Sequence, residues 1–229
     1  MNALNEIKGG LIVSCQALEN EPLHSSFIMA RMAEAAMLGG AAGIRANSAQ
    51  DIMKIKEKVN LPVIGIIKAQ YPDSPVYITP TIREVDELVQ CRCEIIAMDA
   101  TCRLRPAGET LEKFFAGVRK KYPDKLFMAD CSDYADGMKA AAMGFDLIGT
   151  TLCGYTEESK NAITPDYSLM SALVKDSGKP VIAEGNIWTA EQLQSAKNCG
   201  IHAAVIGSAI TRPMLITRRF VNIMNGGQL

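Results

Sequence analysis

The stretch Leu61-Pro-Val-Ile-Gly-Ile-Ile-Lys68 decides the fold. It is a continuous apolar run of strand length that ends on a lysine, and a loop with three prolines follows it as far as Thr81. A strand that is apolar on both faces is typical of a parallel sheet that is covered on both sides. An amine at the end of such a strand is poorly hydrated, so Lys68 is a candidate for a lowered pKa and for proton transfer. The alternative is a lysine that turns out into solvent where the strand ends.

Similar runs recur along the whole chain, and helical patterns alternate with them. Two of these helices begin with predicted capping boxes, Ser48-Ala-Gln-Asp51 and Thr81-Ile-Arg-Glu84, and Ser132 is the predicted cap of another. The last helical pattern begins at Ser208. The predicted strands end, at intervals of 20 to 34 residues, near Ser14, Arg45, Lys68, Asp99, Asp130, Thr150, Glu184 and Gly207.

Eight alternations of strand and helix in 229 residues predict a single (β/α)8 TIM barrel over residues 1–229, with no room for a second domain. An open doubly wound sheet is the competing architecture. That fold needs a glycine-rich fingerprint after its first strand, and the segment from Ser14 to Glu19 does not match one.

Composition excludes several classes of function. The net charge of −1 gives no basic field for nucleic acid, and apolar runs of about seven residues are too short to span a membrane. The first eight residues lack the layout of a signal peptide. The seven scattered cysteines and two histidines have no spacing typical of a zinc site. We therefore expect a reduced, cytoplasmic protein that holds no metal.

Polar side chains follow or end most of the predicted strands. In a TIM barrel the C-terminal ends of all the strands converge on one mouth, where the chemistry takes place. Charged groups confined there shift one another's pKa values. The alternative is an ion-pair network with a purely structural role around the rim. The residues expected to point into the mouth are Gln16, Arg45, Lys68, Asp99, Asp130 and Glu184.

The last two strands are followed by small turns that contain glycine, Gly185-Asn186 and Gly207-Ser208. Main-chain N–H groups at the start of a helix bind phosphate, and the loops after strands seven and eight are the usual phosphate site of such barrels. Arg212 lies just beyond the second turn and can add a charge-assisted hydrogen bond. The predicted ligand is a small phosphorylated metabolite.

The same residues carry a resemblance that spans nearly the whole chain. Its blocks are Leu11-Ile-Val-Ser-Cys-Gln-Ala-Leu18, Glu21-Pro-Leu-His-Ser-Ser-Phe-Ile-Met29, Gly43-Ile-Arg-Ala46, Gly65-Ile-Ile-Lys68, Tyr77-Ile-Thr-Pro-Thr81, Ala97-Met-Asp-Ala100, Gly149-Thr-Thr-Leu-Cys-Gly-Tyr155, Ile182-Ala-Glu-Gly-Asn186 and Ala209-Ile-Thr-Arg-Pro213. In these blocks the chain resembles the N-acetylmannosamine-6-phosphate 2-epimerases.

The resemblance implies a (β/α)8 barrel of sialic acid catabolism that interconverts N-acetylmannosamine 6-phosphate and N-acetylglucosamine 6-phosphate without metal or nicotinamide. It implies that Lys68 and Glu184 are catalytic. It also implies that the substrate contacts Gln16, Arg45 and Asp130, with Arg212 at the phosphate. Ser208 departs from the family pattern, where a second glycine is common.

The chemistry suits these residue types, because the C2 proton of the open-chain sugar lies next to a carbonyl and its removal gives an enolate. Neutral Lys68 is the expected base, and Glu184 is its expected partner in ring opening or proton return. A Schiff base on Lys68 is a rival mechanism. A lysine-dependent aldolase, a phosphosugar decarboxylase and a non-catalytic phosphosugar-binding protein are the alternatives. Apolar residues of the last helix, such as Phe220 and Ile223, favour a homodimer.

Overall fold

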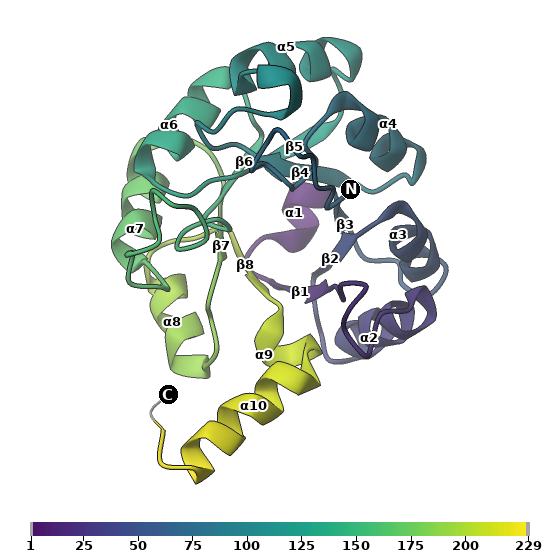
Figure 1. Cartoon of the computed structure of the whole chain (residues 1–229), viewed down its shortest axis with the longest axis vertical. Helices are drawn as coiled ribbons and strands as arrows, with labels where there is room; N and C mark the ends of the chain where they lie inside the picture. The colour runs from purple at the N-terminus through teal and green to yellow at the C-terminus, as the bar shows by residue number, and fades with distance from the viewer. Residues whose placement is uncertain (1, 228–229) are drawn as a thin grey trace.

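Eight short parallel strands pair in sequence order, and β8 pairs with β1, so that the sheet closes into a barrel. This computed structural model describes residues 2–227, and Figure 1 shows most of the helices as a ring outside the strands. The predicted (β/α)8 barrel is thereby confirmed. The strands are β1 (Leu11–Cys15), β2 (Gly43–Asn47), β3 (Val63–Ile66), β4 (Ile95–Asp99), β5 (Leu126–Asp130), β6 (Leu147–Gly149), β7 (Val181–Glu184) and β8 (Ala203–Ile206).

The helices begin where the sequence places capping side chains. Thr81 and Thr189 both form complete capping boxes, and five other helices begin with a single side-chain cap. The helices are α1 (Ala3–Ile7), α2 (Ser26–Leu38), α3 (Ala49–Lys56), α4 (Ile82–Gln90), the short 3-10 helix η1 (Pro106–Gly108), α5 (Leu111–Lys121), α6 (Tyr134–Met143), α7 (Tyr167–Asp176), α8 (Ala190–Asn198), α9 (Ser208–Thr211) and α10 (Pro213–Met224).

The apolar stretch that begins at Leu61 is buried on both faces, as its composition predicts. Ile64 and Ile66 point into the barrel, whereas Val63 packs against the surrounding helices. Gly65 also faces outward, and a Cβ atom there would lie 2.8 Å from Cys93 Sγ and 2.9 Å from the Ile52 side chain. The glycine therefore lets β3 approach its covering helices closely.

Strand β3 is shorter than the sequence predicts, because it ends at Ile66, two residues before Lys68. The proline-containing loop folds back, so that Lys68 pairs with Ile78 in an antiparallel bridge. The main-chain N–H of Lys68 donates to Asn47 Oδ1 at 2.8 Å. Lys68 is thus held at the barrel mouth from two sides even though it lies outside the strand.

Three other local predictions are wrong. Ser48 caps α3, but no capping box forms, because Asp51 accepts a hydrogen bond from Ser26 Oγ at 2.6 Å instead. Asp133, not Ser132, caps α6. The final helix is broken into α9 and α10 at Pro213, which has no N–H and so favours the start of a helix.

Helix α1, which was not predicted, closes the N-terminal end of the barrel, where Ala3 and Ile7 pack against the interior side chains. Helix α10, by contrast, has no buried residue and extends away from the barrel (Figure 1). Within residues 2–227, no helix is both long and apolar enough to cross a membrane.

Candidate active site

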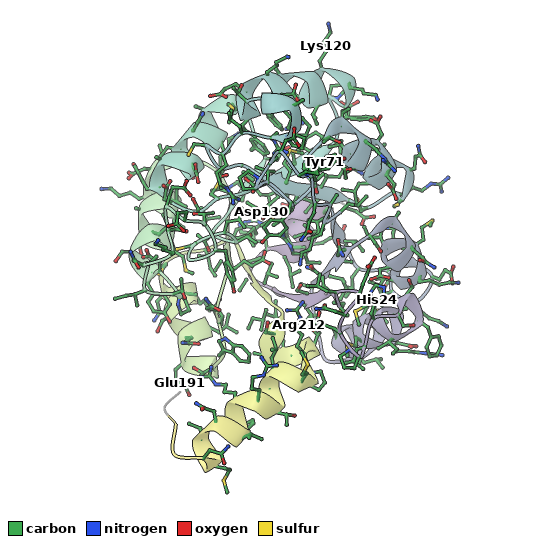
Figure 2. The ribbon with its side chains drawn as sticks, in the orientation of Figure 1. His24, Tyr71, Lys120, Asp130, Glu191 and Arg212 are labelled. Carbon is green, nitrogen blue, oxygen red and sulfur yellow. The ribbon has the colours of Figure 1, made fainter. Side chains whose placement is uncertain are left out.

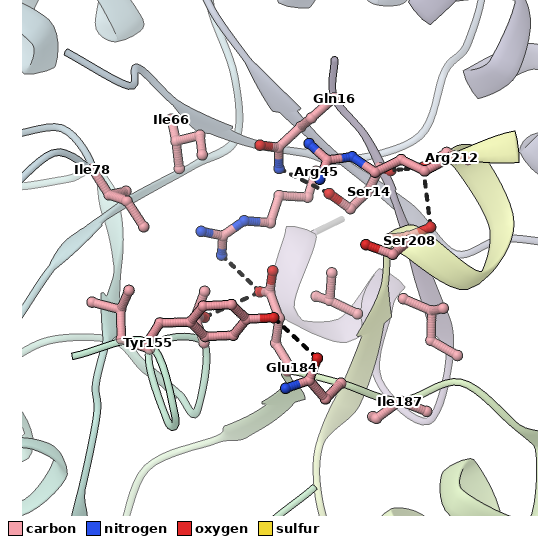
Figure 3. A pocket seen from close by; sticks show the side chains of 18 of the residues that line it. Ser14, Gln16, Arg45, Ile66, Ile78, Tyr155, Glu184, Ile187, Ser208 and Arg212 are labelled. Carbon is pink, nitrogen blue, oxygen red and sulfur yellow. Dashed lines mark hydrogen bonds and ion pairs between the residues drawn. The ribbon is translucent and has the colours of Figure 1, made fainter. Parts of the chain in front are cut away.

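A pocket of about 890 Å³, partly open to solvent, lies at the C-terminal mouth of the barrel. Figure 3 shows side chains from several strands pointing into it. Nine of the eleven predicted site residues line this pocket: Gln16, Arg45, Lys68, Glu184, Gly185, Asn186, Gly207, Ser208 and Arg212.

The other two predicted residues, Asp99 and Asp130, are fully buried and do not line the pocket. They are neighbours in the register between β4 and β5. Asp99 accepts hydrogen bonds from Thr101 Oγ1 at 2.7 Å and from Arg103 Nη2 at 2.5 Å, so its carboxylate is occupied by its own loop. Asp130 lies near the centre of the barrel (Figure 2) and is occupied by Arg45.

Arg45 connects two strands on the far side of the barrel. Its guanidinium forms a bidentate pair with Asp130, at 3.0 and 2.6 Å, and its Nη1 also donates to Glu184 Oε2 at 2.9 Å. Burial alone lowers the pKa of Arg45, but the carboxylates of Asp130 and Glu184 outweigh burial and raise that pKa. Arg45 therefore stays charged although its side chain is only 1% exposed.

The amine of Lys68 has an unusual environment for a lysine. Burial, followed by the positive charges of Arg212 and Arg45, lowers the pKa of Lys68 to about 8, against the opposing effect of Glu184 and Glu21. Among the described residues, Lys68 Nζ forms no hydrogen bond or ion pair. About a tenth of this amine is therefore neutral at pH 7 and able to accept a proton.

The pKa of Glu184 is shifted in the opposite direction, upward. Burial raises the pKa of this carboxyl group to about 7, the charges of Arg45 and Lys68 oppose the rise, and Asp130 adds to it. Its side chain is 15% exposed and reaches the pocket. A carboxyl group with this pKa is present as both acid and carboxylate at neutral pH, as a proton donor and acceptor must be.

The two glycine turns offer main-chain donors to the pocket. Within residues 2–227, the N–H groups of Gly185, Asn186, Gly207 and Ser208 donate to no other residue. Gly185 has a φ of 117°, a conformation that favours glycine. Free N–H groups converging on one place form an anion-binding site.

Arg212 lies at the junction of α9 and α10 (Figure 2) and brings a positive charge to the same end of the pocket. Its Nη2 donates to Glu21 Oε2 at 3.0 Å. Glu21 also accepts the main-chain N–H of Leu18 at 2.7 Å, which fixes the loop that carries it. This carboxylate positions Arg212 and partly balances its charge.

Several pocket residues were not predicted individually. Thr151 donates to Asp130 Oδ1 or Glu184 Oε2, and Tyr155 OH donates to Asn186 Oδ1 at 3.1 Å. Trp188 follows the first glycine turn and lines the pocket too. Thr151 and Tyr155 lie inside one block of the family resemblance, so that block carried a signal for them. Their roles depend on loop geometry that periodicity does not reveal.

The pocket has two chemically different ends. In Figure 3, Arg212 and Ser208 lie at one side of the view, with the apolar Ile187 below them, and the apolar Ile66 and Ile78 lie at the other side. Arg45 and Glu184 lie between them. No cluster of three or more His, Cys, Asp or Glu side chains with the geometry of a metal site occurs in the described part of the chain.

Comparison with known proteins identifies the family of the chain. Residues 29–226 match a family model described as "Putative N-acetylmannosamine-6-phosphate epimerase". A relative from Clostridioides difficile (strain 630) is 55% identical over 218 residues, which cover 95% of this chain and 97% of the relative. Another, from Caldanaerobacter subterraneus subsp. tengcongensis, is 51% identical over 224 residues, covering 98% of this chain and 94% of the relative. Both carry the family's description, with the activity given as 2-epimerase.

A solved structure is similar throughout. It is that of the N-acetylmannosamine-6-phosphate 2-epimerase from Clostridium perfringens, which is 52% identical to this chain. The two superpose with a TM-score of 0.93 over 97% of this chain and 96% of the other. With the family model and the relatives, this shows that the chain belongs to the N-acetylmannosamine-6-phosphate epimerase family.

Proposed function

We propose that this protein interconverts N-acetylmannosamine 6-phosphate and N-acetylglucosamine 6-phosphate by removing the proton at C2 and returning it to the opposite face. The observation that carries the proposal is the pairing of Lys68 and Glu184 in one pocket, beside a cluster of free main-chain donors. Their pKa values, about 8 and about 7, converge from opposite directions.

The near match of these pKa values suits a reaction that runs both ways. In one direction a neutral Lys68 accepts the C2 proton while protonated Glu184 supplies the new one, and in the other direction the roles are reversed. The two forms of the pair carry the same number of protons. Their pKa values lie close together, so moving a proton from Lys68 to Glu184 costs only on the order of 1 kcal/mol. Both forms are thus accessible.

The proton step requires the open-chain aldehyde, because only there is C2 next to a carbonyl. When the C–H bond breaks, its electron pair moves into the C1 carbonyl and gives an enolate. The positive charge of Arg45, fixed in place by Asp130, favours this negative charge. Protonation of the enolate at C2 from the other face then gives the epimer. We propose this supporting role for Asp130, and assign no contact with the sugar to Asp99.

Substrate orientation follows from the two ends of the pocket. We assign the phosphate to Arg212 and the N–H groups of Gly185, Asn186, Gly207 and Ser208. The methyl group of the N-acetyl substituent, which is attached at C2, suits the apolar end near Ile66 and Ile78. Anchoring at the phosphate then holds C2 between Lys68 and Glu184. Gln16, whose Nε2 donates to Ser14 Oγ at 2.8 Å, also lines the pocket and is assigned to the sugar.

The first test is turnover of N-acetylmannosamine 6-phosphate in deuterated water, followed by NMR. The expected product is N-acetylglucosamine 6-phosphate that carries deuterium at C2. Borohydride trapping of a covalent adduct on Lys68 would instead support the aldolase chemistry. Phosphosugar binding with no C2 exchange in the unmodified protein would support a binding protein and refute the proposal.

We further propose that the protein is a homodimer in which the free face of α10 is covered. The most exposed apolar residues of this face are Phe220, at 68%, and Met224, at 85%. A helix with an exposed apolar stripe favours association. Replacing Phe220 with Asp should give a monomer in sedimentation experiments, and an unchanged oligomeric state would contradict the assignment.

We also propose a cytoplasmic location, supported by two observations. All seven cysteines are free, which suits a reducing compartment. The substrate is a sugar phosphate, whose charge keeps it from crossing a membrane unaided. With a net charge of −1, we expect no nucleic acid partner.

A further inference from the structure

Two adjacent threonines after β6 hold Glu184 in different ways. Thr150 Oγ1 accepts the main-chain N–H of Glu184 at 3.1 Å and donates to its carbonyl oxygen at 2.8 Å. Thr151 Oγ1 lies 3.1 Å from Glu184 Oε2 and 2.7 Å from Asp130 Oδ1. The first threonine therefore fixes the backbone of Glu184, and the second contacts its carboxyl group.

The two carboxyl oxygens of Glu184 differ in their hydrogen-bond partners. Oε2 is contacted by both Arg45 Nη1 and Thr151 Oγ1. Within residues 2–227, Oε1 has no hydrogen-bond partner, although the side chain lines the pocket. One oxygen is thus tied to the protein and the other is directed to whatever occupies the pocket.

Thr151 can also adapt to the charge of Glu184. Its hydroxyl has one proton and lies between two carboxylates, so it donates to only one of them at a time. Oε2 of Glu184 can accept that proton when the group is a carboxylate and also when it is an acid protonated at Oε1. The contact with Oε2 therefore survives whether Glu184 is a carboxylate or a carboxylic acid, and the side chain need not move when it changes state.

From this geometry we propose that Thr151 is a positioning residue that holds Oε2 of Glu184, so that proton exchange with the sugar takes place at Oε1. The inference rests on the proposed epimerase function and deepens it. The role falls to Thr151, whose side chain forms hydrogen bonds with Asp130 and Glu184 and not with Lys68 or the residues assigned to the phosphate.

The groups around Glu184 determine in which direction its pKa changes when the Thr151 hydroxyl is removed. Burial and Asp130 raise the pKa of Glu184, whereas Arg45, the Thr151 hydroxyl and Lys68 lower it. Tyr155 also faces Glu184; burial, and after it the charge of Glu184, raises the pKa of that phenol, whereas Arg212 lowers it. Removing the Thr151 hydroxyl therefore raises the pKa of Glu184 above about 7. It also removes one of the two contacts that hold Oε2, so we expect turnover to fall because Oε1 is held less firmly toward the sugar.

The test compares Thr151→Val, which has a similar volume but no hydroxyl, with Thr151→Ser, which keeps the hydroxyl. The pKa of Glu184 is measured by NMR of the ¹³C-labelled carboxyl group, assigned with Glu184→Gln, and needs no turnover. For Thr151→Val we expect a higher Glu184 pKa, an acidic limb of the pH–kcat profile moved to higher pH, and a kcat lower by about tenfold. We expect KM to change by less than about threefold, because the phosphate contacts are intact.

Thr151→Ser should restore the pKa, the pH profile and most of kcat. If Thr151→Val does not fold, Thr151→Ala provides the same measurements. An unchanged Glu184 pKa and pH profile in the variant without a hydroxyl would overturn the inference while leaving the epimerase function standing. Absence of C2 exchange in the unmodified protein would overturn the proposed function and, with it, this role for Thr151.

Discussion

Replacing Asp130 with Asn tests how the buried ion pair controls the chemistry. Asp130 is 0% exposed and Arg45 is 1% exposed, and the change leaves the guanidinium with Glu184 as its only charged partner. Removing one member of a buried pair costs about 3 kcal/mol or more. For a chain of this length, each kcal/mol corresponds to roughly 2–4 °C in Tm. We therefore expect Tm to fall by roughly 6–12 °C.

The same substitution changes the acidity of Glu184. Asp130 raises the pKa of Glu184, so its removal lowers that pKa from about 7. At pH 7 about half of Glu184 is protonated in the unmodified protein, and a fall of one unit leaves about a tenth protonated. Turnover in the direction that uses Glu184 as an acid should then be about fivefold lower than in the unmodified protein at pH 7. At pH 6 the difference should shrink to about twofold, because Glu184 is then about half protonated in the variant as well.

Asp99→Asn is the matched control, since Asp99 is the register partner of Asp130, is also buried and is also paired with an arginine. It does not line the pocket and its carboxylate is not bonded to Arg45. Thermal unfolding followed by circular dichroism and an NMR turnover assay at pH 6 and 7 provide the readouts. The reasoning is refuted if Asp130→Asn keeps full activity at pH 7, or if Asp99→Asn shows the same pH-dependent loss.

Two further predictions follow from the pocket. The reactive form of the Lys68–Glu184 pair carries one proton. A plot of kcat against pH should therefore be bell-shaped, with apparent pKa values near 7 and 8. A flat profile between pH 6 and 9 would contradict this prediction. Arg212→Ala should raise KM for the phosphorylated sugar at least tenfold in steady-state kinetics, because a charge-assisted contact is lost. Glu21→Gln keeps Arg212 and should change KM much less; equal effects of the two changes would place the phosphate elsewhere.

The strand alternation explains why much of the site could be predicted from the sequence. Lys68 has the same parity as Ile64 and Ile66, which fill the barrel interior, and Glu184 has the same parity as the interior Ile182. A polar residue that continues an inward-facing series beyond the end of a strand must point into the mouth. The alternation of side chains between the two faces of a strand was therefore enough to predict the positions of Lys68 and Glu184.

Strand alternation does not show that the two aspartates are covered and kept out of the pocket. Asp130 continues the inward series of Met128, and Asp99 that of Ala97, so both were expected in the pocket. Whether an inward-facing side chain reaches the ligand depends on which other side chains lie over it and pair with it. Arg45 occupies Asp130, and Arg103 of the following loop occupies Asp99. Loop conformation and ion-pair choice depend on tertiary contacts that have no periodic signature.

The most direct test of the account measures C2 exchange in deuterated water with Lys68→Ala and Glu184→Gln, starting from each epimer separately. If the two groups serve opposite faces of C2, each variant should exchange the C2 proton of one epimer without converting it, and the two variants should act on different epimers. Exchange of the same epimer by both variants, or full epimerisation by either, would contradict the account.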